Sequence, residues 1–445
     1  MKPSVDALRG VLDGSIPPII ATVSRDGVPN VSYVSQVEYV DAGHVALSFQ
    51  FFNKTRENIL AHPYATAYLT DSDSAASYRL SIEYLRTETA GQVFERMKAK
   101  LAGIASHTGM AGVFRLQGAD IYKVLAIESV PGDTVAPPPP RRNALGALRT
   151  ASARMARAGD LAQLLDETLA ALHEDFDMPH GMVLLREDAG KRLYIVASRG
   201  YPQSGVGSEI PFGGGVIGTA AEYRTPIRIG YMTNEYAYGM AMRASALEAG
   251  LPSVQDEIPF PGLPMPPSQM AVPILAGGEL LGVLYVDSHE MCRYGHAEED
   301  ALVVLANQLG GGLRAFQQAA DAVEEAAEPV APLHAAGDRR PLRLRRYTEN
   351  DSVFVDDDYL IKGVAGAIFW KLASDYTRHG RTDFSNRELR LDPAIRLPDI
   401  DDNLEARLIL LSRRLRERCD AIAIEKTGRG RFRLCVAQPL ELQEN

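Results

Sequence analysis

The chain has 445 residues, a formal net charge of −10 and three cysteines, and these values narrow the classes of protein it can be. The length suits about three domains. Sparse cysteines (Cys292, Cys419 and Cys435) argue against a disulfide framework and for a reducing compartment. The acidic balance argues against non-specific coating of nucleic acid, and no apolar run reaches the ~20 residues that a membrane helix needs. The first residues, MKPSVDALRG, lack the basic start and apolar core of a signal peptide. We therefore expect a cytoplasmic protein that is not embedded in a membrane, and no metal site, because no Cys/His cluster has the required spacing.

Residues 1–134 are predicted to form mostly short strands. A turn at 25–29 separates the first two strands, and a helix is expected from Lys54 to about His62. The predicted strands cover residues 18–23, 30–37, 44–49 and 64–70. Short strands at this spacing indicate a closed barrel.

Two stretches of this segment carry a family resemblance. IPPIIATVSRDGVPNVSYVSQVEYV, followed by ALSFQFFNKTRENILAHPYATAYL, resembles the FMN-binding split barrel of the pyridoxamine 5′-phosphate oxidase-like superfamily. The resemblance implies that a strand end and the start of the K-T-x-x-N helix hold the phosphate of FMN, and that the barrel forms a homodimer. A helix N-terminus with a lysine beside it suits an anion. The cofactor contacts implied in this sequence are Ser48, Gln50, Phe51, Lys54, Thr55 and Asn58.

The segment also departs from that family. A long insertion, roughly Asp71 to Gly112, contains helical sequence, and the substrate-handling C-terminal signature of the oxidase is not evident. Related barrels bind haem, F420 or nothing, so haem is the alternative cofactor and the oxidase reaction is not carried over. The alternative for Lys54-Thr55 is that these residues only begin an ordinary surface helix.

A proline-rich linker, predicted at 135–144, leads into an α/β segment at 145–318. A helix is expected over 160–176, followed by strands at 180–185 and 193–198. The glycine-rich entry to a helix (IPFGGGVIGTAA), the strand MAVPI and the segment ELLGVLYVDS resemble a GAF domain. The three glycines lack the partners of a phosphate loop, so we interpret them as a tight turn before a helix.

The GAF resemblance implies a small ligand held against one face of the sheet. An unusual stretch, residues 231–269, is rich in tyrosine and methionine, which are adaptable lining for an apolar or planar ligand. The alternatives for residues 231–269 are a lid that packs on the domain's own core or a dimer contact. His289 and His296 near Cys292 are interpreted as surface residues rather than metal ligands. The predicted lining is Tyr231, Tyr236, Tyr238, Met240 and Met270.

A second linker is predicted at 319–345, and the last domain at 346–437. A helix over 359–377 precedes a capping box formed by Ser385 and Glu388. A basic amphipathic helix (403–418) and a basic hairpin follow, which resembles the winged helix-turn-helix of response regulators. The alternative is a related module that mediates protein contacts, because acidic residues at the start of the basic helix would repel phosphate. The predicted DNA contacts are Arg407, Arg413, Arg414, Arg429 and Arg431.

The three segments together predict a multidomain α+β protein: a split β-barrel, an α/β GAF domain and a winged helix. The function that this order favours is a ligand- or redox-responsive regulatory flavoprotein that binds double-stranded DNA and takes a small molecule in its GAF domain. One alternative is an FMN-dependent oxidoreductase with a regulatory GAF domain. Another is a scaffold that binds neither flavin nor DNA.

Overall fold

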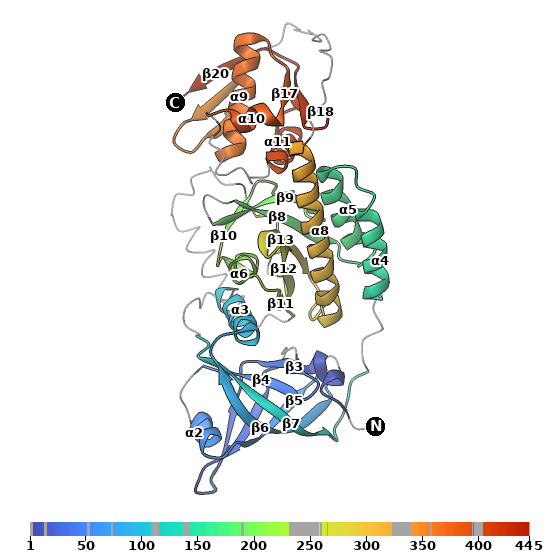
Figure 1. Ribbon diagram of the computed structural model, residues 1–445, viewed down its shortest axis with the longest axis vertical. Coiled ribbons are helices and arrows are strands. Elements are labelled where there is room, and N and C mark those ends of the chain that lie inside the picture. The colour runs from blue at the N-terminus through green and yellow to red at the C-terminus, as the bar shows by residue number, and fades with distance from the viewer. Residues whose placement is uncertain are drawn as a thin grey trace.

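The computed structural model shows three units stacked along its longest axis (Figure 1). We call them the barrel unit (3–136), the central unit (143–322) and the C-terminal unit (340–444). None of the described helices is long and apolar enough to cross a membrane. The structure describes residues 3–12, 16–50, 54–72, 74–107, 115–136, 143–187, 191–230, 258, 260–264, 266–322, 340–356, 358–393, 395 and 404–444.

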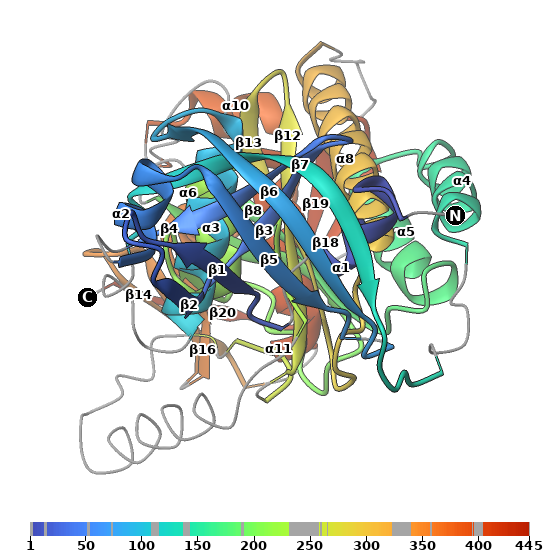
Figure 2. The same cartoon turned by 90° about the horizontal axis from the view of Figure 1, so that it is seen from below.

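The barrel unit is one strongly curved sheet with the strand order β2-β1-β5-β6-β7-β4-β3. Its edge strands, β2 and β3, are consecutive in the sequence, so residues 34–36 connect the two edges of this curved sheet, which Figure 2 shows from below. The single strand predicted over 30–37 is therefore wrong: the chain leaves β2 at Tyr33 and begins β3 at Val37. The elements are η1 (Asp6–Leu8), α1 (Arg9–Leu12), β1 (Ile19–Val23), β2 (Pro29–Tyr33), β3 (Val37–Asp41), β4 (His44–Phe49), α2 (Lys54–Ala61), β5 (Tyr64–Thr70), β6 (Ser77–Glu88), α3 (Gln92–His107) and β7 (Gly118–Val130).

Within the predicted insertion, α3 confirms the helical part, whereas β6 belongs to the barrel wall. Alternating apolar residues of the strands point inward, and Leu80, Ile82 and Tyr122 are among the fully buried side chains. Helix α3 leaves the barrel and lies against the central unit (Figure 1).

The central unit is a six-stranded antiparallel sheet with the order β10-β9-β8-β13-β12-β11. Helices α4, α5 and α8 cover one face and α6 the other, so residues 268–274 of β12 are buried on both sides (Figure 1). The elements are α4 (Ala144–Met155), α5 (Leu161–Glu174), β8 (His180–Glu187), β9 (Arg192–Arg199), β10 (Glu209–Pro211), α6 (Gly215–Tyr223), β11 (Ile227–Ile229), β12 (Ser268–Ala276), β13 (Glu279–Ser288) and α8 (His296–Ala322).

Two local predictions for the central unit are confirmed. The helix predicted over 160–176 is present as α5 (Leu161–Glu174), and the Asp160 side chain caps it by accepting a hydrogen bond from the backbone amide of Gln163. The glycine run makes the predicted tight turn, since Gly213 and Gly215 have φ of +75° and +58° and α6 begins at Gly215.

The C-terminal unit contains two small sheets, ordered β16-β15-β14-β20 and β17-β19-β18, and three helices. The capping box of Ser385 and Glu388 is present at the start of α10, as predicted. The elements are β14 (Leu342–Tyr347), β15 (Ser352–Val355), β16 (Asp358–Ile361), α9 (Gly363–His379), β17 (Asp383–Ser385), α10 (Asn386–Leu391), α11 (Leu404–Arg418), β18 (Ile422–Gly428), β19 (Arg431–Val436) and β20 (Leu440–Glu444).

The helix predicted from Tyr359 is wrong at its start. Residues 358–361 pair with β15 as a strand, and Gly363, at φ +64°, separates them from α9. The predicted linker also contains β14, which pairs in parallel with β20 at the far end of the chain.

Candidate functional site

The barrel unit contains a cavity of about 200 Å³ between β2, β4 and the start of α2. Gln50 lines this cavity and is only 7 % exposed. Neither polar atom of its amide has a hydrogen-bond partner among the described residues. An unsatisfied buried amide costs about 1–3 kcal/mol, so a group that binds here gains a ready donor and acceptor.

A buried ion pair forms part of the same cavity wall. The Arg56 guanidinium donates to both carboxylate oxygens of Asp120 at 2.7 Å and to the Thr87 hydroxyl at 2.7 Å. It also lies 4.5 Å from the ring centre of Phe49. Burial raises the pKa of Asp120, and the hydrogen bonds from Thr87 and Arg56 offset only part of that rise. The pair fixes the position of one positive charge at the cavity.

The structure brings three of the predicted cofactor residues together: Ser48, Gln50 and Thr55 line the cavity. The Ser48 hydroxyl accepts a hydrogen bond from the Gln36 amide, and the Thr55 hydroxyl accepts one from the Asn30 side chain.

The other predicted cofactor residues are placed differently. Lys54 begins α2 with an exposed side chain and lies outside the described lining of the cavity. Asn58 is buried and donates to the Thr22 hydroxyl, which ties α2 to β1. Phe51 falls outside the described residues.

Arg56 and Asp120 were not predicted as site residues. A signal for Asp120 is present in the sequence, because it is a single acidic residue inside the apolar run Ala119-Asp120-Ile121-Tyr122. A carboxylate in the middle of a buried strand requires a partner, although the run does not say which one.

The central unit holds a second buried polar cluster around Asp287, at the end of β13. Asp287 is fully buried and accepts hydrogen bonds from the Tyr201 hydroxyl at 2.9 Å and the Leu263 amide at 3.0 Å. Burial raises the pKa of Asp287 and that of Tyr201. The His180 ring centre lies 5.6 Å from that of Tyr201, and burial lowers the pKa of His180.

The predicted ligand lining of the central unit is mostly outside the described residues, which is where Tyr231, Tyr236, Tyr238 and Met240 fall. Met270 is described: it lies in β12, fully buried within the core. Its contact with a ligand stays a prediction. No group of three metal-binding side chains is found in the described part of the chain.

Helix α11 presents two of its three predicted DNA-contact arginines, Arg407 and Arg413, to the central unit. Arg407 is 3 % exposed, forms an ion pair with Glu187 of β8 at 3.3 Å and lies over the Tyr194 ring of β9. Arg413 donates to the Val196 carbonyl of β9 and to Asp166 of α5, both at 2.7 Å.

Arg414 is turned toward the C-terminal unit itself, where it donates to the Leu360 carbonyl at 3.1 Å. Arg407, Arg413 and Arg414 therefore meet protein partners in this structure, and their contact with DNA stays a prediction.

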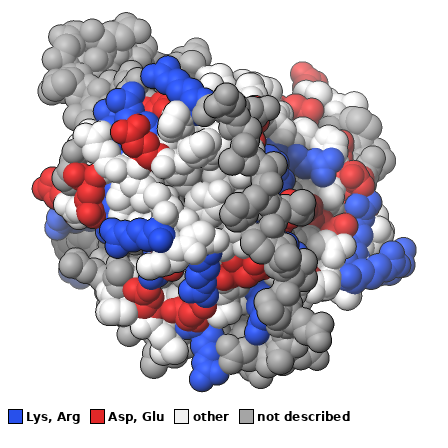
Figure 3. All heavy atoms as spheres, turned by 90° about the horizontal axis from the view of Figure 1, so that it is seen from above, with Lys and Arg blue, Asp and Glu red and all other residues white. Residues whose placement is uncertain are grey.

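The two predicted contacts in the hairpin lie nearer the surface. Arg429 is exposed in the turn between β18 and β19, and Arg431 is half-buried in β19. Viewed from the C-terminal end, basic and acidic side chains are interspersed rather than gathered into one basic face (Figure 3).

Comparison with known families assigns the central unit. A family model described as the GAF domain matches residues 158–314, and the chain therefore contains a GAF domain. An uncharacterised protein of Methanocaldococcus jannaschii is 39 % identical over 70 residues, which are 15 % of this chain and 47 % of that protein. The chain thus spans about half the length of the curated relative it matches.

Solved structures resemble separate parts of the chain. A free methionine-R-sulfoxide reductase of Neisseria meningitidis is 22 % identical, with 40 % of this chain and 91 % of that chain covered and a TM-score of 0.31. An FMN-binding protein of Syntrophomonas wolfei is 20 % identical, with 29 % and 86 % covered and a TM-score of 0.25. Group A Streptococcus HupZ is 22 % identical, with 27 % and 95 % covered and a TM-score of 0.22. At these values the likenesses carry no argument about activity.

Proposed function

We propose that the chain is a cytoplasmic, ligand- or redox-responsive regulator whose C-terminal unit is a winged helix-turn-helix that binds double-stranded DNA. The observation that carries this proposal is the docking of α11 on the GAF domain. The charged face of α11 contacts α5, β8 and β9 of the GAF domain. Two ion pairs, Arg407–Glu187 and Arg413–Asp166, join the helix to that domain. A GAF domain that holds the helix expected to enter DNA is in direct physical contact with the output of the protein.

The ion pairs of that interface support a mechanism in which the GAF domain covers the DNA-binding cations. Asp166 pairs with Arg413 on the helix, and Asp160 pairs with Lys426 on the hairpin at 3.3 Å. Both cations are of the kind that neutralise DNA phosphates. The GAF carboxylates thus pair with the cations that DNA phosphates would otherwise contact. DNA binding therefore requires the two units to separate. A ligand that binds the separated form more tightly would shift the population toward it.

Retention of a random double-stranded DNA pool tests this proposal. The combined Asp160→Asn and Asp166→Asn variant is expected to bind DNA more tightly than the unmodified chain, with a steep dependence on salt. The matched control is Glu174→Gln at the far end of α5, which pairs with Arg154 instead. Arg413→Ala with Arg429→Ala, which removes two of the predicted DNA contacts, is expected to abolish retention. If no variant retains DNA at low salt, the C-terminal unit is a protein-interaction module.

For the barrel unit we propose FMN as the cofactor, with haem as the alternative. The residues fit a phosphate-bearing flavin: Ser48 and Thr55 offer hydroxyls, Lys54 offers charge at the start of α2, and Gln50 offers an unpaired amide. When bound, the flavin supplies reversible redox chemistry. The Arg56–Asp120 pair holds the cavity wall in place.

An absorption spectrum of the purified protein, with identification of any released chromophore, tests the cofactor. A flavin spectrum is expected, and Lys54→Ala or Gln50→Ala should lower its occupancy. Lys123→Ala, exposed on β7, is the control for loss of a surface lysine. Full occupancy in both site variants would reject the residue assignment, and a Soret band would replace FMN by haem.

The second candidate function is an FMN-dependent oxidoreductase, and the unpaired Gln50 amide in the cavity favours it. Steady consumption of NAD(P)H with an added acceptor would support this function over the regulator. Both candidates include a homodimer. Val31 and Tyr33 on β2 are 67 % and 76 % exposed, a surface that a second barrel would cover.

A further inference from the structure

A cavity of about 290 Å³ lies where the GAF domain meets the C-terminal unit. Helix α5 contributes Asp160 and Asp166 to one wall. The opposite wall is a single stripe of α11, because lining residues 405, 408, 409, 412, 413 and 416 recur at intervals of three or four. Strands β18 and β19 complete the cavity with Lys426 and Arg431.

The charges in the described lining of this cavity do not balance. That lining has four cations (Arg413, Arg416, Lys426 and Arg431) against three carboxylates (Asp160, Asp166 and Glu405). Each carboxylate already has a partner, since Asp166 binds Arg413 and the other two bind Lys426.

Two cations remain without an acidic partner in the described part of the chain: Arg416 and Arg431. Arg416 is exposed at the cavity, whereas Arg431 is half-buried and its Nε has no hydrogen-bond partner among the described residues. A cation that is partly removed from water and left unpaired is a site for an anion.

The rest of the lining is apolar. Leu408 and Phe432 are 8 % and 4 % exposed, and Ile409 and Ile424 are half-buried beside them. Inorganic phosphate would leave this surface uncovered, whereas a compact organic anion would cover it and reach the arginines together.

We propose that this cavity binds a small aromatic carboxylate or a similar organic anion. The charged group lies with Arg416 and Arg431, and the ring packs against Leu408 and Phe432. Because the walls belong to two units, such a ligand stabilises their docked arrangement over the separated one. The expectation that this ligand lowers the affinity for DNA rests on the proposed function above. Binding of the ligand to the cavity does not depend on that function.

The test uses the full chain and the probe 8-anilinonaphthalene-1-sulfonate, an aromatic sulfonate that fluoresces in apolar surroundings, with benzoate as competitor. We expect saturable binding that benzoate displaces. The combined Arg416→Gln and Arg431→Gln variant should raise the probe's Kd by about tenfold or more. The matched control, Arg378→Gln with Arg418→Gln, removes the same charge from exposed positions outside the described lining and should leave Kd unchanged.

A second variant tests the volume of the cavity without changing charge. Ser412→Phe places a ring inside it and should block the probe while the circular dichroism melt stays cooperative. Equal Kd in the unmodified chain, the double arginine variant and Ser412→Phe would overturn the proposal. So would an equal loss in the control, because the effect would then be one of net charge. No DNA is present in this titration, so its failure rejects the cavity and leaves the DNA experiment to decide the proposed function.

Discussion

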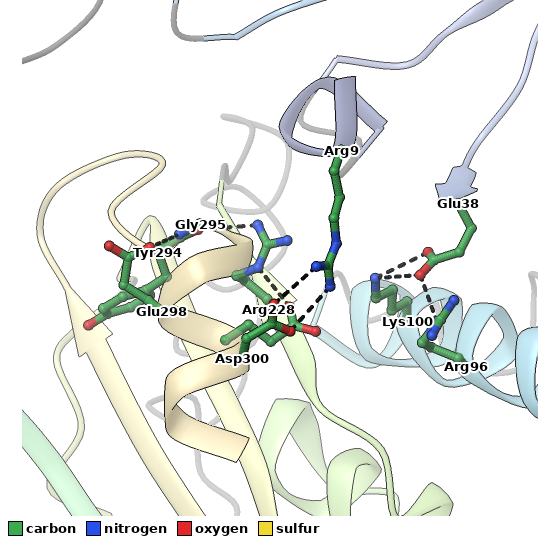
Figure 4. A network of polar contacts seen from close by, with 10 residues as sticks. Arg9, Glu38, Arg96, Lys100, Arg228, Tyr294, Gly295, Glu298 and Asp300 are labelled. Atoms are coloured by element: carbon green, nitrogen blue, oxygen red, sulfur yellow. Dashed lines mark hydrogen bonds and ion pairs between the residues drawn. The ribbon is translucent and has the colours of Figure 1, made fainter. Parts of the chain in front are cut away.

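The GAF domain is attached to its two neighbours in different ways. On the barrel side the junction is largely polar (Figure 4): Arg9 reaches Asp300 at 3.0 Å, and both side chains are well exposed. Lys100 of α3 pairs with Glu38 inside the barrel unit at 3.1 Å, and its charge also helps to lower the pKa of Glu299 in the GAF domain. The barrel keeps two hydrophobic cores of its own, and α3 joins the GAF core through the fully buried Ala99.

On the C-terminal side the hydrophobic core runs on without a break. Leu410 and Leu411 of α11 belong to the same buried cluster as the GAF strands, and so do Phe369 of α9 and Phe432 of β19. Buried charges cross the same junction, with Arg407 fixed between Glu187 and Tyr194.

The difference indicates which neighbour packs more tightly on the GAF domain. A change in the GAF sheet moves atoms that pack directly on α11, because close-packed cores transmit displacement. A change in the barrel reaches the GAF domain mainly through α3. The following variants test this contrast.

Arg407→Ala should have the largest effect. It leaves Glu187 without this partner and opens the packing against Tyr194. Breaking a buried ion pair costs about 3–5 kcal/mol, which should appear as a lower free energy of unfolding in denaturant titrations. The exposed Arg418→Ala on the same helix should stay within about 0.5 kcal/mol. An equally small loss of unfolding free energy in Arg407→Ala and Arg418→Ala would show that the buried ion pair does not stabilise this junction.

Acid pH should weaken the barrel junction. Burial raises the pKa of Glu299, but the charges of Lys100 and Arg228 outweigh burial, and the net pKa is lowered from 4.5. A carboxyl with a lowered pKa stabilises the fold fully above 4.5, and that stability is lost as pH falls through its lower, folded-state pKa. Glu299→Gln should lose about 1.5–3 kcal/mol at neutral pH and show a flatter pH profile of Tm. An unchanged profile would show that this carboxyl does not govern acid stability.

Asp166→Asn should have a moderate effect at the other junction. The Asp166 carboxylate is well exposed, so its ion pair with Arg413 contributes about 1 kcal/mol or less to stability. Hydrogen exchange should then show faster opening of α11 with little change in β4 of the barrel. Faster exchange spread evenly over both units would contradict separate junctions.

Arg9→Ala should have the smallest effect, within about 0.5 kcal/mol, because both partners of the pair are exposed to solvent. Thermal melts at low and high salt should overlap those of the unmodified chain. A larger loss would mean that the polar barrel junction is stronger than its exposure indicates.

Local sequence signals predicted elements whose cause is local. The capping box at Ser385 and Glu388 and the glycine turn before α6 each depend on a few adjacent residues. Pairing between distant segments was missed, as β14 and β20 illustrate. Their register depends on the folded unit and leaves no local pattern.

The functional surfaces were only partly predictable for a related reason. A stripe of arginines on a helix has the same pattern whether it faces phosphate or the carboxylates of another domain. Arg413 meets Asp166, which lies far away in the sequence, and only the tertiary structure reveals that encounter. In the barrel, the K-T-x-x-N motif placed Thr55 at the cavity but gave no sign of the Arg56–Asp120 pair.

A covalent bridge between the GAF domain and the C-terminal unit tests directly whether DNA binding requires the two units to separate. Ser204 of the GAF domain donates a hydrogen bond to Glu417 of α11 at 2.5 Å, so cysteines at both positions can be bridged by a short bismaleimide. We expect the bridged protein to lose its retention of double-stranded DNA, whereas the same variant without the bridge keeps it. Equal retention by the bridged and unbridged proteins would contradict this expectation, because α11 would then bind DNA without leaving the GAF domain.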